Sequence, residues 1–143
     1  MNEKLTVLVV DDEHPVLITA AAVLSEDFRV LTASGAAEAL RLLERNAIDV
    51  VCTDFNMPGQ NGIQLLREAT SRRPHLSGVL VTGHAEYLEK RNTYDAQGLY
   101  YLLMKPYEPA RLVEIVQRAA ESARLKRVMS SLTTELGAWK RVM

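Results

Sequence analysis

Polar side chains with the means to do chemistry together follow four apolar runs of this sequence. Asp11 and Asp12 come directly after one run and Asp54 after another, while Thr82 and Lys105 end two more. If these runs are parallel strands of one sheet, their carboxyl ends meet at the same edge, however far apart they lie in the chain. The sequence therefore predicts one site that holds three carboxylates, a hydroxyl and an ammonium.

Carboxylates that lie this close together repel one another, and a bound cation relieves the repulsion. A site made of oxygen ligands favours Mg2+, which keeps coordination positions for water or for phosphate oxygens. One carboxylate can then attack phosphorus to give an acyl phosphate, while the cation, the lysine and the threonine stabilise the charge that develops on the phosphoryl oxygens. The residue types thus predict Mg2+-dependent phosphoryl transfer to an aspartate.

Strands and helices that would position these residues alternate along the chain. Apolar runs rich in β-branched residues predict strands at 5–10, 28–33, 48–53, 76–82 and 99–104. Helices are predicted at 15–24, from an N-cap at Ser34 through Ala37, Leu40, Leu43 and Ala47, from Gly62 to just before Pro74, at 85–96, and from Pro109 through Ala119. This order predicts right-handed βαβ units, and hence an α/β fold whose parallel sheet is covered on both faces.

Residues 121–143 carry a different pattern. Apolar side chains recur there at alternating intervals of four and three residues, at Leu125, Met129, Leu132, Leu136, Trp139 and Met143. This is the spacing of a short coiled-coil seam, although Gly137 weakens its last turns. Two interpretations stay open: the stripe folds back on its own domain, or the helix leaves the domain and pairs with a second chain or leads to a further segment.

Length and composition are those of one soluble domain. The 143 residues suffice for a hydrophobic core, and a net charge of −1 gives no reason to expect nucleic-acid binding by this chain. Cys52 is the only cysteine, which excludes a disulfide within the chain and fits a reducing compartment. Neither a signal peptide nor a run long enough to span a membrane is found, so we expect a cytoplasmic protein without a membrane partner.

Four motifs stand at the ends of the predicted strands. They are Val-Val-Asp-Asp-Glu at 9–13, Asp-Phe-Asn-Met-Pro-Gly-Gln-Asn-Gly at 54–62, Val-Thr-Gly-His-Ala at 81–85 and Lys-Pro at 105–106. Together, and in this order, they resemble the receiver domain of bacterial two-component response regulators over about residues 4–120. The resemblance implies a flavodoxin-like (βα)5 fold, a doubly wound parallel sheet with strand order 2-1-3-4-5. Residues 121–143 would then form an extended C-terminal helix that serves as a coiled-coil linker or a dimerisation helix.

The resemblance also implies roles for the residues of the acidic cluster. Asp54 would accept a phosphoryl group from a histidine kinase or a histidine phosphotransfer protein. Mg2+ would bind the carboxylates of Asp12 and Asp54 and the backbone carbonyl of Asn56, with Asp11 acting through a water molecule. Such a domain assists its own phosphorylation and dephosphorylation, but in the family it is a switch and not a turnover enzyme.

The phosphoryl group itself would be held by Thr82 and Lys105. Asn56 and His84 would lie at the rim of the site, where they are candidates for tuning the access of water and hence the lifetime of the acyl phosphate. For His84 the simpler interpretation is a rim residue without a role, because the other histidines of the chain show no metal-ligand spacing with it.

One position departs from the family pattern. Regulators of this family usually carry Tyr or Phe three residues before the lysine, where the ring reports the movement of the threonine, and here that residue is Leu102. Tyr100 and Tyr101 lie just before it and are candidates to replace the aromatic relay. Because strand side chains alternate, we expect Tyr100 to share a face with Leu102 and Tyr101 to point the other way.

Phosphorylation is expected to rearrange the face made by the fourth strand, the 85–96 helix, the fifth strand and the last helix. That change would control an output domain or a partner protein. Either this face or the C-terminal helix is a candidate contact for a homodimer.

Other functions remain as alternatives. A degenerate receiver would act as a constitutive protein-binding scaffold. A phosphoaspartate hydrolase of the haloacid dehalogenase type would need two aspartates separated by one residue after the first strand, whereas Asp11 and Asp12 are adjacent. A flavin or nucleotide binder would need a glycine- or hydroxyl-rich loop there, and the acidic residues would repel phosphate without a metal.

Overall fold

Five parallel strands form one sheet in the order β2-β1-β3-β4-β5. The computed structural model describes residues 4–83 and 99–142. In chain order its elements are β1 (Thr6–Val10), α1 (His14–Leu24), β2 (Arg29–Ala33), α2 (Ala36–Arg45), β3 (Val50–Asp54), α3 (Gly62–Arg72), β4 (Ser77–Thr82), β5 (Leu99–Met104) and α5 (Pro109–Val142). This topology is flavodoxin-like, so the predicted fold class and strand order are confirmed.

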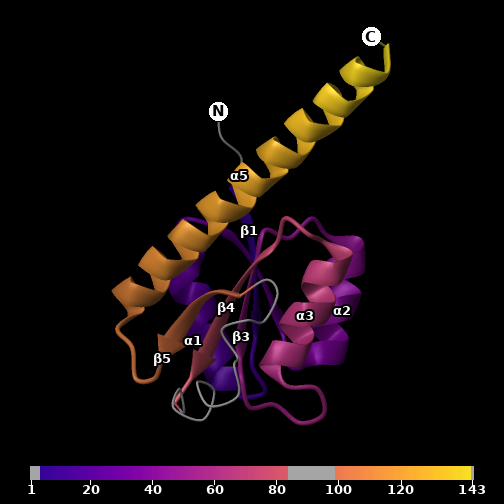
Figure 1. Ribbon diagram of the computed structural model, residues 1–143. Helices are drawn as coiled ribbons and strands as arrows, with labels where there is room; N and C mark the ends of the chain where they lie inside the picture. The colour runs from indigo at the N-terminus through magenta and orange to yellow at the C-terminus, as the bar shows by residue number, and fades with distance from the viewer. Residues whose placement is uncertain (1–3, 84–98, 143) are drawn as a thin grey trace.

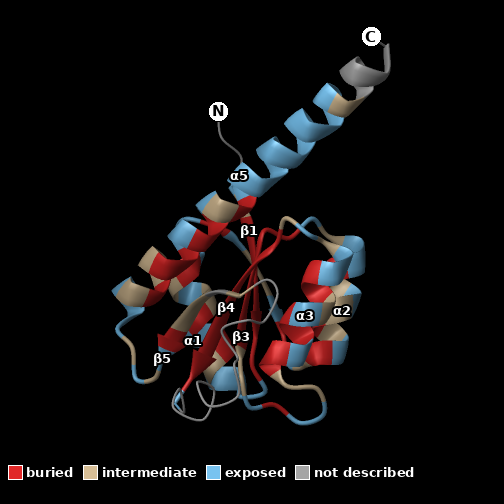
Figure 2. Cartoon of the chain, viewed as in Figure 1, coloured by how far each residue is buried: buried red, intermediate tan, exposed pale blue. Residues whose placement is uncertain are grey.

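Helices cover both faces of the sheet, as Figure 1 shows. On one face, Leu8 and Leu80 pack in a core cluster with α2 and α3. On the other face, Val7 and Val79 pack with α1 and α5. Because both faces are covered, β1, β3 and β4 form the buried layer seen in Figure 2, and their sequences read as nearly continuous apolar runs, whereas the edge strand β2 is mostly exposed or half-buried.

Adjacent strands are paired up to their carboxyl ends, with one register shift between β4 and β5. Val10 of β1 pairs with Thr53 of β3, and Asp54 pairs with Val81 of β4. The residues that follow these strands are therefore neighbours at one edge of the sheet.

The start of α2 differs from the prediction. Gly35, not Ser34, is the N-cap residue, and the Ser34 hydroxyl donates a hydrogen bond to the Glu38 carboxylate at 2.9 Å. The apolar face is also rotated, because Ala37 is exposed and Ala47 lies beyond the end of the helix and is exposed too. Alanine occurs both on buried and on solvent-facing helix surfaces. The spacing of the alanines therefore led to a wrong prediction of which face of α2 is buried.

The α3 helix begins and ends where the sequence predicted. The Asn61 side chain accepts from the Gln64 backbone N–H at 2.9 Å, and the Gln64 side chain accepts from the Asn61 N–H at 2.8 Å. This capping box satisfies two backbone donors and sets the first turn of the helix. The helix ends at Arg72, before Pro74.

The α5 element is one continuous helix of 34 residues, and it extends well beyond the sheet (Figure 1). Its first half packs on the sheet as far as Ala123, which is fully buried. Beyond that point the helix surface is largely exposed (Figure 2), with Met129 at 64% and Leu136 at 61% exposure. The described residues of the apolar seam therefore do not fold back on the domain, and the predicted boundary after residue 120 falls inside a single helix.

Some predictions concern residues outside the described ranges. The 85–96 helix, Met143 and the side chain of Trp139 belong to this group. Within 4–83 and 99–142, the structure contains no helix with both the length and the apolar character that a membrane crossing requires.

Candidate functional site

Three carboxylates meet at the carboxyl edge of the sheet. Asp11 and Asp12 follow β1, and Asp54 is the last residue of β3, the neighbouring strand. Each offers an oxygen atom, and these oxygens all lie within 4.8 Å of one another. Asp11 is buried while Asp12 is exposed, so the cluster has one side in the protein and one side open to solvent.

Burial raises the pKa of Asp11, and the nearby charges of Asp54 and Asp12 raise it further. The backbone N–H of Glu13, which donates to Asp11 Oδ1 at 2.9 Å, opposes this shift in part. The charge of Lys105 also lowers the pKa, yet the pKa stays raised, so the ionised form of Asp11 is disfavoured unless further positive charge lies nearby. A cluster of hard oxygen donors that needs positive charge fits Mg2+ in its chemistry.

Lys105 supplies one positive charge to the cluster. It follows β5, and its Nζ atom lies 2.9 Å from Asp54 Oδ1. Burial by itself lowers the pKa of Lys105, but the hydrogen bond to Asp54 and the negative charges of Asp54 and Asp11 outweigh burial, so the pKa is raised. The lysine is thus held as an ammonium ion directly against the carboxylate.

Thr82 is the last residue of β4 and is buried. Because Asp54 pairs with Val81, Thr82 lies one residue beyond the level of Asp54 on the adjacent strand. Its backbone carbonyl accepts a hydrogen bond from the Lys105 N–H at 2.9 Å, which ties the ends of β4 and β5 together. The strand ends thus bring the hydroxyl-bearing residue and the ammonium to the same edge as the acids.

Gly62 allows the loop after β3 to close tightly on the site. A Cβ atom at this position would lie 2.4 Å from the backbone oxygen of Asp54 and 2.8 Å from Leu80 Cδ1. The Gly62 N–H also donates to the Phe55 carbonyl at 3.0 Å. The lack of a side chain at this glycine therefore permits close approach of α3 to the end of β3.

The proposed relay residues separate onto two faces of β5. Leu102 packs against the core cluster on the α2 and α3 face. Tyr101 packs on the other face, where Arg111 Nη2 donates to its hydroxyl at 2.6 Å and the guanidinium carbon lies 5.4 Å from its ring centroid. Tyr101 therefore points away from Leu102, as predicted.

The pairing of β5 with β4 is nevertheless not regular. A register shift lies between Gly78 and Val79, where Gly78 pairs with Leu99 but Val79 pairs with Tyr101. Leu99 and Leu102 consequently pack in the same core cluster although they are three residues apart, which simple alternation does not allow. The prediction that Tyr100 shares the face of Leu102 assumed regular alternation across this shift, and the Tyr100 side chain lies outside the described residues.

Asn56 and His84 were the two further candidates. Asn56 is exposed in the loop after β3. His84 lies outside the described residues, so its predicted part in controlling the lifetime of a phosphoryl group stays a prediction.

Sequence reasoning missed one buried carboxylate, that of Asp49. It directly precedes β3, accepts the Thr6 backbone N–H at 2.8 Å and forms an ion pair with Arg127. A signal was present, because a charged residue between Ile48 and Val50 interrupts a run that a buried strand would keep apolar. The sequence contained no sign of the partner, which lies 78 residues away.

Comparison with known proteins agrees with this arrangement. A family model described as the response regulator receiver domain matches residues 7–117. The hydrogenase transcriptional regulatory protein HoxA of Cupriavidus necator is 35% identical over 135 residues, which cover 94% of this chain and 28% of that protein. The DNA-binding transcriptional regulator NtrC of Escherichia coli is 31% identical over 114 residues, covering 79% of this chain and 24% of NtrC. The chain thus spans about a quarter of the length of these relatives.

Solved structures of response regulators also resemble this chain. A response regulator receiver domain protein from Clostridium thermocellum superposes with a TM-score of 0.76 at 34% identity, covering 85% of this chain and 98% of that one. NtrX from Brucella abortus superposes with a TM-score of 0.80 at 32% identity, covering 91% of this chain and 30% of NtrX. Since the family model covers most of the sequence and the sheet topology agrees, this chain belongs to the family of response regulator receiver domains.

Proposed function

We propose that this chain is a phosphorylation-controlled signalling switch in which Asp54 is the phosphoacceptor. The observation that carries the proposal is the contact of 2.9 Å between Lys105 Nζ and Asp54 Oδ1, within a cluster that also contains Asp11 and Asp12. The donor would be a histidine kinase or a histidine phosphotransfer protein, and the acceptor would work in the cytoplasm. The switch would then act on an output domain or a partner protein, without turnover of a metabolite.

Each residue of the cluster has a task in this proposal. Asp12, Asp54 and the backbone carbonyl of Asn56 would hold Mg2+, with Asp11 acting through water. When bound, Mg2+ would supply positive charge against the oxygens of the phosphoryl group.

The transfer itself would use the side chains of Asp54, Lys105 and Thr82. A carboxylate oxygen of Asp54 attacks phosphorus as the bond from phosphorus to the histidine nitrogen of the donor breaks, and the imidazole leaves. The Lys105 ammonium neutralises charge on the transferred group, and the Thr82 hydroxyl donates to one of its oxygens.

The test is to incubate the protein with acetyl phosphate and Mg2+, and to map the modified residue by mass spectrometry. We expect stoichiometric labelling of the peptide that contains Asp54, loss of labelling when EDTA removes the metal, and none in Asp54→Asn. Asp27→Asn is the matched control, since it makes the same change at an exposed acid in the turn after α1 and should label like the wild type.

Other outcomes would point to other functions. A folded wild-type protein that takes up no label would favour the scaffold alternative. Multiple turnover of a phosphate ester would favour the hydrolase alternative. The presence of all the expected acidic and basic groups in contact gives the scaffold alternative no specific support.

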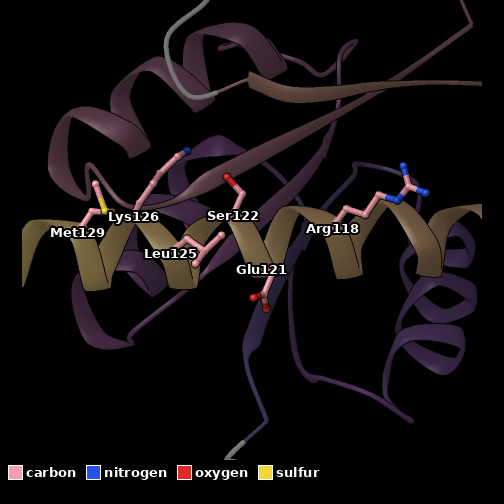
Figure 3. Close-up of a pocket in the computed structure, with 6 residues that line it drawn as sticks. All are labelled: Arg118, Glu121, Ser122, Leu125, Lys126 and Met129. Atoms are coloured by element: carbon pink, nitrogen blue, oxygen red, sulfur yellow. The ribbon is translucent and has the colours of Figure 1, made fainter.

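We also propose that a second copy of this chain binds the exposed seam of α5. This seam comprises Leu125, Met129, Leu132 and Leu136, all exposed and spaced by four, three and four residues. It continues from an open groove beside the helix, which Figure 3 shows around Leu125 and Met129. The other candidate face of the homodimer includes the 85–96 segment, which lies outside the described residues.

Charge favours a parallel arrangement of the two copies. In a parallel, in-register pair, a residue at heptad position g faces position e of the next heptad in the other chain. With Leu132 at position d, the sequence puts Glu135 at position g and Lys140 at the facing position e, and these two residue types carry opposite charges. An antiparallel pair would instead bring positions g against positions g and positions e against positions e, so the Glu135 and Lys140 positions would no longer face each other.

Replacing Leu132 with aspartate is expected to abolish this association, because it puts a charge at the centre of the apolar seam. Sedimentation equilibrium over a series of protein concentrations should show a dimer for the wild type and a monomer for Leu132→Asp. Ser131→Asp adds the same charge outside the seam and should leave the dimer intact. A monomeric wild type, or a dimeric Leu132→Asp, would contradict this interface.

A further inference from the structure

The projecting half of α5 is tied to the domain by polar contacts at the amino-terminal edge of the sheet. Lys126 Nζ lies 3.4 Å from the hydroxyl oxygen of Ser77, the first residue of β4. Arg127 Nη2 lies 3.1 Å from His75 Nε2 and also forms an ion pair with Asp49. These contacts involve a helix that has already left the hydrophobic core, so they restrain it where apolar packing no longer does.

The Asp49 carboxylate is the central group of this cluster. Its side chain is only 5% exposed, and a buried charge is costly unless it is paired and hydrogen-bonded. The Thr6 N–H satisfies one oxygen at 2.8 Å, and Arg127 supplies the opposite charge at the other. The ion pair with Arg127 thus compensates the buried charge of Asp49 and also restrains α5.

Arg127 suits this position for geometric reasons. Its planar guanidinium carries several donors in a fixed fork, so one group can contact both Asp49 and His75. Burial lowers the pKa of His75, and the charge of Arg127 lowers it further. The imidazole is therefore neutral near pH 7 and can accept from the guanidinium without charge repulsion.

The last apolar contacts of α5 with the domain use small side chains. Ala119, Ala120 and Ala123 are all buried, and they bring the helix close to the sheet. Each methyl group buries little apolar area, so these contacts contribute less stabilisation than larger side chains would. The ion pair between Arg127, one turn after Ala123, and Asp49 adds a further contact that restrains the direction of the helix.

We infer that Asp49 and Arg127 form an anchor that sets the angle at which the projecting half of α5 leaves the sheet. The inference concerns the direction of the helix and does not depend on phosphorylation or on dimer formation. It gives Asp49 a positioning role at the start of β3, the strand that ends in Asp54.

The test measures the distance between spin labels on introduced cysteines, Arg41→Cys on exposed α2 and Ser131→Cys on the projecting helix. Cys52 stays unlabelled because it is buried and its thiol pKa is raised to about 12. An excess of unlabelled chain restricts the signal to distances within one chain. We expect a single narrow distance in the otherwise wild-type protein and the loss of that narrow maximum in Arg127→Gln.

Arg124→Gln is the matched control. It makes the same change three residues earlier, where the arginine pairs with Glu121 of its own helix, so the distance should stay narrow. Asp49→Asn should act like Arg127→Gln, and the double variant should broaden the distance no further, since both changes remove one interaction.

An unchanged distance in Arg127→Gln would overturn the anchor. Equal broadening in Arg124→Gln would also overturn it, because the effect would then come from general fraying of the helix. Should Asp49→Asn fail to fold, the comparison of Arg127→Gln with Arg124→Gln still decides, as both arginine side chains are largely exposed.

Discussion

Replacing Lys105 with alanine is expected to slow phosphorylation of Asp54 by about 100-fold or more, the usual loss when one charge-stabilising donor is removed from a transition state. The ammonium lies 2.9 Å from the acceptor carboxylate, so it is placed to neutralise charge on the incoming group. Its removal also takes away the ammonium that lies against this group of three carboxylates. The measurement is the initial rate of labelling by acetyl phosphate at saturating Mg2+.

Two variants complete this experiment. Lys4→Ala makes the same change at an exposed lysine before β1, at the opposite edge of the sheet, and should label at the wild-type rate. Lys105→Arg keeps the charge but presents a planar fork in place of a compact ammonium, and we expect an intermediate rate. A wild-type rate in Lys105→Ala would remove the lysine from the proposed chemistry.

Gly62→Ala is expected to have the largest effect on stability. The added methyl would lie 2.4 Å from the Asp54 carbonyl oxygen, a backbone atom that cannot move without moving the end of β3. Overpacking of this kind costs about 1–3 kcal/mol and sometimes more. Alanine would otherwise favour a helical position by about 0.5–1 kcal/mol, so a net loss shows that the clash outweighs helix propensity. Urea unfolding followed by circular dichroism measures the change.

Gly83→Ala serves as the reference for this substitution. Chain neighbours aside, a Cβ atom there meets no atom of residues 4–83 and 99–142 within 4 Å, so we expect a change within about 0.5 kcal/mol. If both variants unfold at the same urea concentration, α3 can withdraw from β3 without cost, and the close approach has no energetic importance.

The sequence was sufficient to predict the fold and the gathering of the acids at one edge. Both depend on local patterns, namely apolar runs that end in polar residues, and on the rule that parallel strands place their carboxyl ends together. That rule assigns residues as distant as Asp11 and Lys105 to one edge from the amino-acid sequence alone. The contact between Lys105 and Asp54 follows from the reach of a long side chain across β4.

Other features depend on information that local patterns do not contain. The N-cap residue of α2 is Gly35, while the Ser34 hydroxyl forms a hydrogen bond with the Glu38 carboxylate. The register shift between Gly78 and Val79 depends on how β5 meets β4, and not on the β5 sequence alone. The pairing of Asp49 with Arg127 joins two positions whose distance is set by the complete fold, so only the structure reveals it.

The unbroken course of α5 has a mechanical consequence. From Ala123 to Val142 the helix rises by about 28 Å, at about 1.5 Å per residue. A rigid rod of that length is a lever arm, and a tilt of roughly 10° at its base displaces its tip by about 5 Å. In a flexible linker of equal length, a tilt at the base would not produce a defined displacement of the far end, because the linker samples many conformations. A small change of tilt at the base of the helix would therefore be amplified along the rod.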